Sequence, residues 1–297
     1  MNPVKSILRR SVREAARQGL LPAPIAARLL FRIALGRFPD LKNPRDFNEK
    51  VMWLEFNTDT TRWSELADKI AVRDYVRAKG LGGILLEQYC YADSPEQISL
   101  AGLPGRFVMK TNNGNAQTLL VRDKSLVTEA ALRRTAARWM RSKRWKASAE
   151  PHYGRIRPRI LFEQMLPGAE SDIPVDYKFF CFDGKALYCE VCTERETKHF
   201  NCKMQFYKLP DWKLTEGIVI DSEQSEIFTE RPEHLDLMIQ YAETLAGDMP
   251  FMRVDLFDTP QGVFFGELTF TPSAARIDWL TPGALREFGD MIELKEK

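Results

Sequence analysis

The chain has 297 residues, of which 44% are hydrophobic and 28% are charged, and its formal net charge at pH 7 is +2. This composition is typical of a soluble globular protein long enough for two or three lobes, and the near-neutral charge points to no particular charged partner. No run of about 18 uncharged apolar residues exists, so we expect neither a transmembrane helix nor a secretory signal.

The cysteines do not predict a disulfide framework, because there are five of them in a chain of this length. We take a reducing cytoplasm as the default. One group, Cys189, Cys192, His199 and Cys202, carries the ligand types that zinc prefers. However, Cys189 and Cys192 lie three positions apart in an expected strand, where their side chains point to opposite faces. Ordinary thiols are therefore the favoured interpretation, and a zinc site is the alternative.

The first 39 residues contain eight lysines and arginines against one acid, Glu14. Their spacing predicts a basic amphipathic helix near the start, and a second helix over Ile25 to Gly36 follows Pro22 and Pro24. A basic amphipathic helix is commonly the solvated face of a docked helix, but it can also lie on an anionic membrane surface. We predict an N-terminal helical extension over residues 1–60 and leave peripheral membrane contact open.

Two further helices are expected before the first strand. The helix from Asp46 to Leu54 opens with an acidic first turn, and a second helix runs from Leu66 to Val76. We assign structural rather than catalytic roles to three polar residues of the second helix: Asp68, a possible cap, Lys69 and Arg73. Residues 61–105 form a predicted N-terminal subdomain.

A strand–loop–strand unit follows. The strand Arg106 to Lys110 ends in a lysine, and a polar loop with Gly114 leads into a strand over Thr118 to Arg122. Such a unit can fold over the phosphates of a nucleotide through backbone N–H groups and the lysine, although a plain hairpin turn explains the same residues. Together with an apolar strand over Arg159 to Leu166, it makes a predicted lid over residues 106–168.

Between these strands, Val127 to Lys146 reads as one basic amphipathic helix. Its charged side is either a solvated face or an attractor for an anionic substrate. No motif in the segment supports binding to nucleic acid.

The remainder, residues 169–297, is predicted to be a C-terminal subdomain built on two hairpins. Asp183-Gly184 joins the strands Asp176 to Phe182 and Lys185 to Thr193. Alternation along the first strand places Lys178 on one face with aromatic neighbours, where a buried lysine requires an anion. A strong helix over Pro232 to Ala246 leads into the last hairpin.

The last hairpin, Phe251 to Thr271, has the most informative alternation in the chain. Met252, Val254 and Leu256 share one face of its first strand, and Phe264, Leu268 and Phe270 share one face of its second. The opposite faces carry polar groups: Arg253, Asp255, Glu267 and Thr269. Hard oxygen ligands of this kind suit Mg²⁺. The alternative is a solvated outer face with a surface salt bridge between Arg253 and Glu267.

Several short phrases along the chain keep a specific order and separation over about residues 38 to 290. They are Asp46-Phe47-Asn48-Glu49-Lys50, Asp68-Lys69 with Arg73 and Tyr75, Phe107-Val108-Met109-Lys110-x-Asn112-x-Gly114, Asp176-Tyr177-Lys178-Phe179-Phe180-Cys181-Phe182-Asp183-Gly184, Phe251-x-Arg253-Val254-Asp255-Leu256 and Gly266-Glu267-Leu268-Thr269-Phe270-Thr271-Pro272. In these phrases the chain resembles the ATP-grasp superfamily. More narrowly, it resembles the TupA-like branch, which is associated with teichuronopeptide and cell-surface polysaccharide biosynthesis.

The resemblance implies an α+β fold in which two lobes hold ATP between them, here preceded by the helical extension. It also implies roles for residues that bind the nucleotide. Lys110 and Lys178 match the two cations on the phosphates, with Asn112 and Gly114 in the loop that closes over them. The hinge acid near the adenine amino group matches Glu163, the backbone groups after it belong to residues that include Gln164 and Leu166, and the acid on the ribose matches Glu170.

The resemblance further assigns Asp255 and Glu267 as the two Mg²⁺ carboxylates and Arg253 as the arginine that steadies the acyl phosphate. Two departures from the superfamily pattern stand out. At the position where the superfamily often has an asparagine as a third metal ligand, this chain has Thr269. The branch that the chain resembles also has threonine there. The loop from Thr111 to Gln117 is also poorer in glycine than usual.

The implied reaction is ATP- and Mg²⁺-dependent joining of a carboxylate to an amine, with Arg253, Lys110 and Lys178 as the catalytic residues. By resemblance, the carboxylate belongs to a uronic acid, a glycan or an amino-acid precursor in the cytoplasm, and a location at the inner face of the membrane stays open. One rival is a kinase on the same fold. The other is a non-catalytic binding protein on the same scaffold, either zinc-containing or membrane-peripheral.

Overall fold

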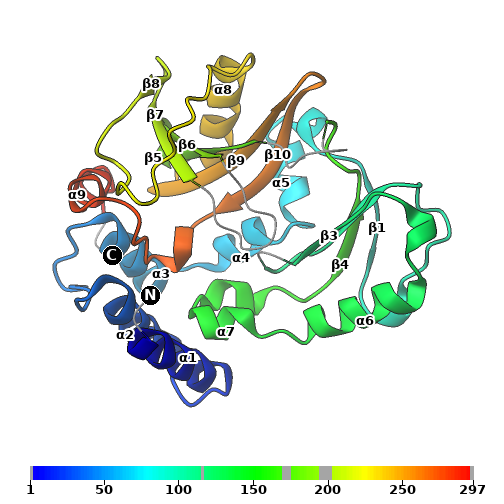
Figure 1. Cartoon of the computed structure of the whole chain (residues 1–297), viewed down its shortest axis with the longest axis horizontal. Coiled ribbons are helices and arrows are strands. Elements are labelled where there is room, and N and C mark those ends of the chain that lie inside the picture. The colour runs from blue at the N-terminus through cyan, green and yellow to red at the C-terminus, as the bar shows by residue number, and fades with distance from the viewer. Residues whose placement is uncertain (1–2, 115–116, 169–174, 194–202, 295–297) are drawn as a thin grey trace.

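The computed structural model describes residues 3–114, 117–168, 175–193 and 203–294. The described chain contains two antiparallel sheets (Figure 1). The smaller sheet has the order β1-β4-β2-β3, and the larger sheet has the order β10-β9-β5-β6-β7-β8. The expected α+β architecture of two lobes is confirmed.

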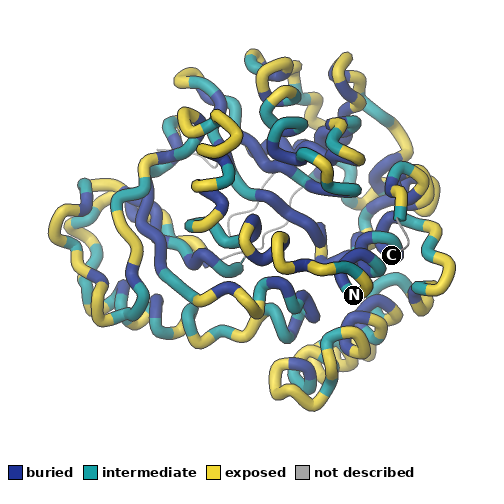
Figure 2. Tube along the Cα trace, turned by 180° about the vertical axis from the view of Figure 1, so that it is seen from behind, coloured by how far each residue is buried: buried dark blue, intermediate teal, exposed yellow. Residues whose placement is uncertain are grey.

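Of the N-terminal helices, α3 (Phe47–Asn57) lies near the larger sheet, whereas α1 (Pro3–Arg17) and α2 (Ala23–Leu35) pack together farther from it (Figure 1). Gly36 ends α2 in the left-handed conformation, with φ 78°. At the start of α3 the Asp46 carboxylate accepts from the backbone N–H of Glu49, and the Glu49 side chain closes a capping box. Figure 2 shows that α1 is largely exposed along its length. The predicted helices of this region are therefore present.

The single helix predicted over Leu66 to Val76 is wrong. The structure has two short helices instead, α4 (Thr61–Ala67) and α5 (Val72–Ala78), separated by a turn. Within the turn, Asp68 Oδ1 accepts from the backbone N–H of Ile70 at 2.8 Å. The Lys69 N–H donates to the carbonyl of Asn112 at 3.1 Å rather than to the preceding turn of helix. These two bonds compete with the helical pattern and end α4.

The smaller sheet, called the lid sheet below, is built from β1 (Gln88–Ala92), β2 (Phe107–Thr111), β3 (Thr118–Val121) and β4 (Ile160–Glu163). β1 comes from the range 61–105, and its pairing with β4 places it in the lid sheet. The buried side chains of this sheet and of α6 (Glu129–Met140) form a core cluster of their own. The cluster consists of Ala92, Ile98, Leu103, Phe107, Met109, Val121, Leu132, Ala136, Ile160 and Phe162.

The helix predicted over Val127 to Lys146 is also two helices in the structure. After α6, Lys143 leaves the helical region with φ −100° and ψ 46°. The chain then enters α7 (Arg144–Ser148), which packs against α1. The basic segment therefore divides between the lid and the N-terminal extension.

The larger sheet, called the base sheet below, has both faces covered over much of its area. Its strands are β5 (Asp176–Phe182), β6 (Lys185–Thr193), β7 (Lys203–Lys208), β8 (Lys213–Leu214), β9 (Phe251–Thr259) and β10 (Gly262–Thr269). Helix α8 (Leu235–Ala246) lies on one face. On the other face, α3 and α9 (Pro282–Asp290) contribute Phe47 and Phe288, which pack with Phe180, Phe182 and Phe251. The aromatic cluster covers one end of that face. Beyond this end, the same face carries charged residues such as Lys178 and Asp255.

The hairpin of β9 and β10 contains an irregularity that the sequence analysis did not anticipate. The register shifts between Phe265 and Glu267, at Gly266. A Cβ atom on Gly266 would lie 2.8 Å from the carbonyl oxygen of Asp255, so only glycine fits this bulge. The extra residue reverses the alternation, so Phe264 pairs with Phe257 and does not share the face of Leu268. The prediction for Phe264 is therefore wrong.

Short 3₁₀ turns connect these elements. They are Gly82–Ile84, Pro95–Gln97, Lys124–Leu126, Pro151–Arg155 and Pro272–Ala274.

Candidate functional site

A row of four charged residues crosses four strands of the base sheet. Lys178 on β5 is the register partner of Glu190 on β6 and of Asp255 on β9. Asp255 in turn is the partner of Glu267 on β10. Directly paired residues of neighbouring strands have their side chains on the same face, about 5 Å apart. The register therefore brings three carboxylates and one ammonium into one line.

Arg253 organises the carboxylates of this row. Its guanidinium donates two hydrogen bonds to Asp255, with Nε and Nη2 each 2.7 Å from a carboxylate oxygen. Nη2 also lies 3.5 Å from Glu267 Oε1 and 3.2 Å from the hydroxyl of Thr269. The Thr269 hydroxyl donates to Glu267 at 3.3 Å. The four predicted residues thus form one connected cluster.

The cluster is not a solvated outer face. Asp255 is only 5% exposed and Thr269 only 8% exposed, although a third of the Glu267 side chain meets solvent. Burial raises the pKa of Asp255, against the opposing charges of Arg253 and Lys178. Burial also opposes ionisation of Glu267, but Lys69 and Arg253 outweigh it and lower the pKa of that group. Two neighbouring acids whose pKa values are shifted in opposite directions are typical of a functional site.

Lys178 is buried and is held by neighbours on β5 and β6. Its ammonium donates to the Asp176 carboxylate, and Cys192 Sγ lies 3.4 Å away. The anion that a buried lysine was expected to require is therefore supplied by Asp176. Burial raises the pKa of the adjacent Glu190 to about 8, and among the described residues its Oε2 atom has no hydrogen-bond partner.

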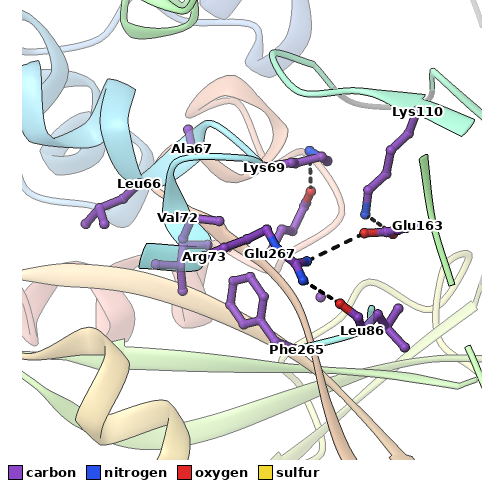
Figure 3. Close-up of a pocket in the computed structure, with 12 residues that line it drawn as sticks. Leu66, Ala67, Lys69, Val72, Arg73, Leu86, Lys110, Glu163, Phe265 and Glu267 are labelled. Carbon is purple, nitrogen blue, oxygen red and sulfur yellow. Dashed lines mark hydrogen bonds and ion pairs between the residues drawn. The ribbon is translucent and has the colours of Figure 1, made fainter. Parts of the chain in front are cut away.

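The lid sheet and α5 bring a second group of charges toward the first (Figure 3). Lys110 Nζ lies 2.5 Å from Glu163 Oε1, and Arg73 Nη1 lies 3.9 Å from Glu163 Oε2. Lys69 Nζ lies 3.1 Å from Glu267 Oε2 and donates to the carbonyl of Gly114, also at 3.1 Å. These residues line one small cavity between the lid sheet and β10. The predicted lysine of the lid therefore shares a cavity with the predicted metal carboxylate of the base.

Asn112 is fully engaged within the protein. Its side-chain Nδ2 donates to Asp68 Oδ1 and to the carbonyl of Arg157, both at 3.0 Å, and its Oδ1 accepts from the Arg159 N–H at 2.7 Å. The side chain therefore fixes the start of the loop that contains Gly114, rather than extending into open space.

The residues expected at the adenine ring lie at the lid edge. Gln164 exchanges hydrogen bonds with Glu87, donating through its backbone and accepting through its side chain. Leu166 packs with Leu86, Met165, Phe257 and Phe264 in an apolar patch between the two sheets. Such a patch is a suitable surface for a flat aromatic ring. Glu170, the expected ribose ligand, lies outside the described residues.

Three residues of the site were missed or undervalued by the sequence analysis. Lys69 received a structural role, yet it contacts Glu267. Glu190 and Phe257 received no role. Alternation along β6 puts Glu190 in step with Cys192, but only the pairing of β5 with β6 shows that Glu190 faces Lys178. The signal for Phe257 was its parity with Asp255 on one strand.

The donor set fits magnesium better than zinc. Within residues 3–114, 117–168, 175–193 and 203–294, no three histidines, cysteines and acids gather in a way that could hold a metal. Asp255 and Glu267 are a pair of hard oxygen donors, and Mg²⁺ is commonly bound by one or two carboxylates together with substrate phosphates. Of the four zinc candidates, His199 and Cys202 lie outside the described residues. Cys189 and Cys192 are both buried.

A larger cavity adjoins the same carboxylates. It has a volume of about 850 Å³ and is lined by Arg253, Glu267 and Thr269 at the base sheet. A cavity of this size accommodates a small-molecule substrate. Of the two predicted metal carboxylates, Glu267 therefore lines both the small cavity under the lid and this larger one beside the N-terminal helices.

The structure has two α+β lobes, with Lys110 on the lid and the carboxylates Asp255 and Glu267 on the base. This arrangement agrees with the class of ATP-grasp proteins that the sequence resembles. The match to a family model supports this class independently. The model of the TupA-like ATP-grasp family matches residues 49–293, and the chain belongs to that family. Among curated proteins, no sequence matches this chain.

Solved structures similar to this chain are ATP-grasp proteins of low sequence identity. A structure of the ATP-grasp ligase PsnB with a precursor variant, Mg and ADP is 14% identical, with a TM-score of 0.44 over 82% of this chain and 64% of PsnB. D-alanine–D-alanine ligase from Bacillus anthracis with ATP is 14% identical, with a TM-score of 0.43 over 77% of this chain and 65% of that ligase. The chain therefore spans just under two thirds of the length of each.

Helices long and apolar enough to cross a membrane are absent from the described residues.

Proposed function

We propose that the protein is an ATP- and Mg²⁺-dependent ligase that joins a carboxylate to an amine through an acyl phosphate. The observation that carries this proposal is the meeting of Lys110, Lys69 and Glu267 in one cavity, with Asp255, Arg253 and Lys178 beside Glu267 on the base sheet. Phosphoryl transfer needs positioning and neutralisation of charge spread over oxygens, and this arrangement supplies both. Membership of the TupA-like ATP-grasp family supports the same reaction.

Each lobe has a distinct part in the proposed reaction. Lys110 and Lys178 would bind phosphate oxygens, and the apolar patch around Leu166 and Phe257 would receive the adenine ring. Asp255 and Glu267 hold Mg²⁺, with Thr269 as a further oxygen. A bound Mg²⁺ supplies neutralisation of the charge on the phosphates. Arg253, which already spans both carboxylates, orients the acyl phosphate and binds the oxyanion that forms when the amine attacks.

Closure of the lid against the base excludes water from the reacting groups. An acyl phosphate hydrolyses readily, so exclusion of water favours the amine over hydrolysis. Gly114 and Asn112 belong to the lid loop, and the bonds from Asn112 to the backbone hold the start of that loop in position. We propose that this loop covers the phosphates.

The decisive experiment measures ADP release over pairs of carboxylates and amines. A ligase releases ADP only when both are present, and the amide product contains neither phosphate nor a free carboxylate at the reacting carbon. ADP release without an amine, with a stable phosphorylated product, would instead show a kinase. Stoichiometric zinc without binding of Mg·ATP would show a non-catalytic protein. The Asp255→Asn variant serves as the blank.

For the pathway, we propose a role in the biosynthesis of a surface polysaccharide or a teichuronopeptide-like polymer, in agreement with the association of the family. The carboxylate substrate would then be a uronic acid, a glycan or an amino-acid precursor. Helix α1 exposes Val4, Ile7 and Leu8 beside basic residues, which supports peripheral contact with an anionic membrane at the cytoplasmic face. Sedimentation with anionic vesicles tests this contact, and equal sedimentation with neutral vesicles would contradict it.

A further inference from the structure

The larger cavity beside the proposed metal site is strongly basic. Helix α1 contributes Arg9, Arg13 and Arg17 to its lining, at positions i, i+4 and i+8 on one side of the helix. The lid contributes Arg138, and α7 contributes Arg144. The lining also contains Arg276, which is held by a 2.9 Å hydrogen bond from Nη2 to the Ser148 carbonyl.

The acids in this lining do not neutralise the arginines. They are Glu150, Glu267 and Asp278. Glu150 is buried, accepts a hydrogen bond from Thr271 at 2.6 Å, and has a pKa raised by burial. Glu267 is already paired with Lys69. Arg17 pairs with Glu14 on the same helix at 2.8 Å, whereas in the described part of the chain Arg9, Arg13, Arg138 and Arg144 form no ion pair.

The arginines at the outer end of the cavity are close to one another. Burial and the like charges of Arg9, Arg144 and Arg17 lower the pKa of Arg13. Clustered guanidinium groups repel one another, so an unneutralised cluster of this kind is unfavourable without an anionic ligand. The cluster comes from two elements, α1 and α7, that pack together. Helix α1 lies outside residues 49–293, the part of the chain that matches the family model.

We propose that this end of the cavity is a second anion site, distinct from the ATP site, that binds a diphosphate group on the substrate to be ligated. The proposal rests on the proposed ligase function, because the same cavity is also lined by Arg253 and Glu267. The reacting group of the substrate lies at those residues, and its charged end extends to the arginines of α1. The N-terminal extension is therefore part of the substrate site.

The compactness of the cluster favours a diphosphate over a chain of carboxylates. A diphosphate concentrates two or more negative charges in one small group, and guanidinium groups bind phosphate oxygens with two parallel hydrogen bonds. Carboxylates along a polymer are spaced one per unit and would meet these arginines singly. The cavity volume of about 850 Å³ leaves room for a sugar between the diphosphate and the reacting carboxylate or amine.

The test measures binding of inorganic pyrophosphate to the full chain by calorimetry, in the presence of saturating ADP and Mg²⁺ to occupy the ATP site. The double variant R9Q/R13Q and the single variant R144Q, which lies on a different element, should weaken this binding by about tenfold or more. The matched control is R10Q, which removes the same charge from α1 at an exposed position outside the cavity. Unchanged binding in R9Q/R13Q and in R144Q would overturn the proposal.

Three further probes identify the source of the diphosphate. Tighter binding of UDP than of pyrophosphate would assign a nucleotide-linked substrate, and tighter binding of geranyl diphosphate would assign a lipid-linked one. Binding of tetraglutamate as tight as that of pyrophosphate would overturn the choice of a diphosphate. These measurements need no catalysis. Loss of ligase activity in every assay would therefore refute the proposed reaction without affecting the result for the anion site.

Discussion

The two sheets of this protein differ in size, in the core they belong to and in the elements that cover them. The lid sheet has four strands, and its core cluster is separate from the one that joins the base sheet to helices α2–α5 and α9. The base sheet has six strands, covered by α8 on one face and by the aromatic cluster around Phe47 on the other. Because each lobe has its own core, one can move relative to the other without breaking either core. Asp255, Glu267 and Lys178 lie on the base, and Lys110 lies on the lid.

The largest expected effect comes from removing a charge from the base. Asp255→Asn should lower amine-dependent ADP release by about 10²–10³-fold, because the side chain that pairs with Arg253, and that we propose as a Mg²⁺ ligand, loses its charge. The rate of ADP release measures this effect. Asp258→Asn makes the same change on the same strand, where the acid pairs with His234 at 2.6 Å, and should leave the rate within a few-fold of the wild type. Equal losses in both variants would show that the effect is structural.

Removing a charge from the lid should weaken nucleotide binding more than removing a charge from the base does. Lys110→Gln should weaken ATP binding by about tenfold, since one charge-assisted contact to the phosphates is lost while Glu163 keeps a hydrogen-bonding neighbour. Calorimetry with a non-hydrolysable ATP analogue measures this change. Lys143→Gln, an exposed position between α6 and α7, is the control. If Lys110→Gln lowered the rate without changing ATP affinity, the lid lysine would not bind phosphates in the ground state.

The geometry of the base hairpin can be disturbed without touching a charged group. Gly266→Ala should lower the free energy of unfolding by about 1–3 kcal/mol, because the new Cβ atom would meet the carbonyl oxygen of Asp255 at 2.8 Å. It should also shift the register that pairs Glu267 with Asp255. Thermal unfolding measures the first effect and ADP release the second. Gly83→Ala, whose Cβ meets nothing within 4 Å, should be neutral for both.

The remaining prediction concerns the pH dependence of stability in the base lobe. Burial raises the pKa of Glu55 to about 8, so the folded state binds a proton that the unfolded state releases above about pH 4.5. Stability should therefore fall as the pH rises toward 8, by at most about 1.4 kcal/mol per unit from this group. Its neighbour His152, at 3.1 Å, has a pKa lowered to about 4 by burial, so stability should also fall below pH 6.5.

Urea unfolding between pH 5 and 8.5 tests this dependence. Glu55→Gln should flatten the decline on the alkaline side and leave part of it, because burial raises the pKa of Glu190 in the same direction. An unchanged slope in Glu55→Gln would show that the carboxyl group is ionised when the protein is folded.

The sequence was most informative where alternation and register coincide. The parity of Arg253 and Asp255 on one strand, and of Glu267 and Thr269 on the next, correctly predicted one connected cluster. The same reasoning failed for Phe264, because the bulge at Gly266 adds one residue and a pattern of alternation cannot reveal an insertion of one. The helix breaks after Ala67 and Met140 were also missed. A side-chain or backbone bond to a distant segment, such as Lys69 to Asn112, ended a helix that local propensity favoured.

Contacts between segments far apart in the chain were the hardest to predict. Glu190 faces Lys178 only because β6 pairs with β5, and Lys69 reaches Glu267 only because the turn after α4 lies against β10. The basic character of α1 was visible in the sequence, but its location was not. Nothing in the spacing of Arg9, Arg13 and Arg17 indicates that they share a cavity with Arg253.

The contacts of Lys69 have a consequence for the order in which the protein loads its ligands. Its ammonium touches a carbonyl of the lid loop and a carboxylate of the base at the same time, each at 3.1 Å. Without ligands, the acidic pair therefore already has an internal counterion, and that counterion ties the two lobes together. Arrival of a divalent ion at Glu267 then becomes an exchange of one cation for another, and the displaced lysine releases the loop. We expect titration with Mg²⁺ alone to accelerate amide hydrogen exchange at the end of β2, and a Lys69→Gln variant to show the faster exchange before any metal is added.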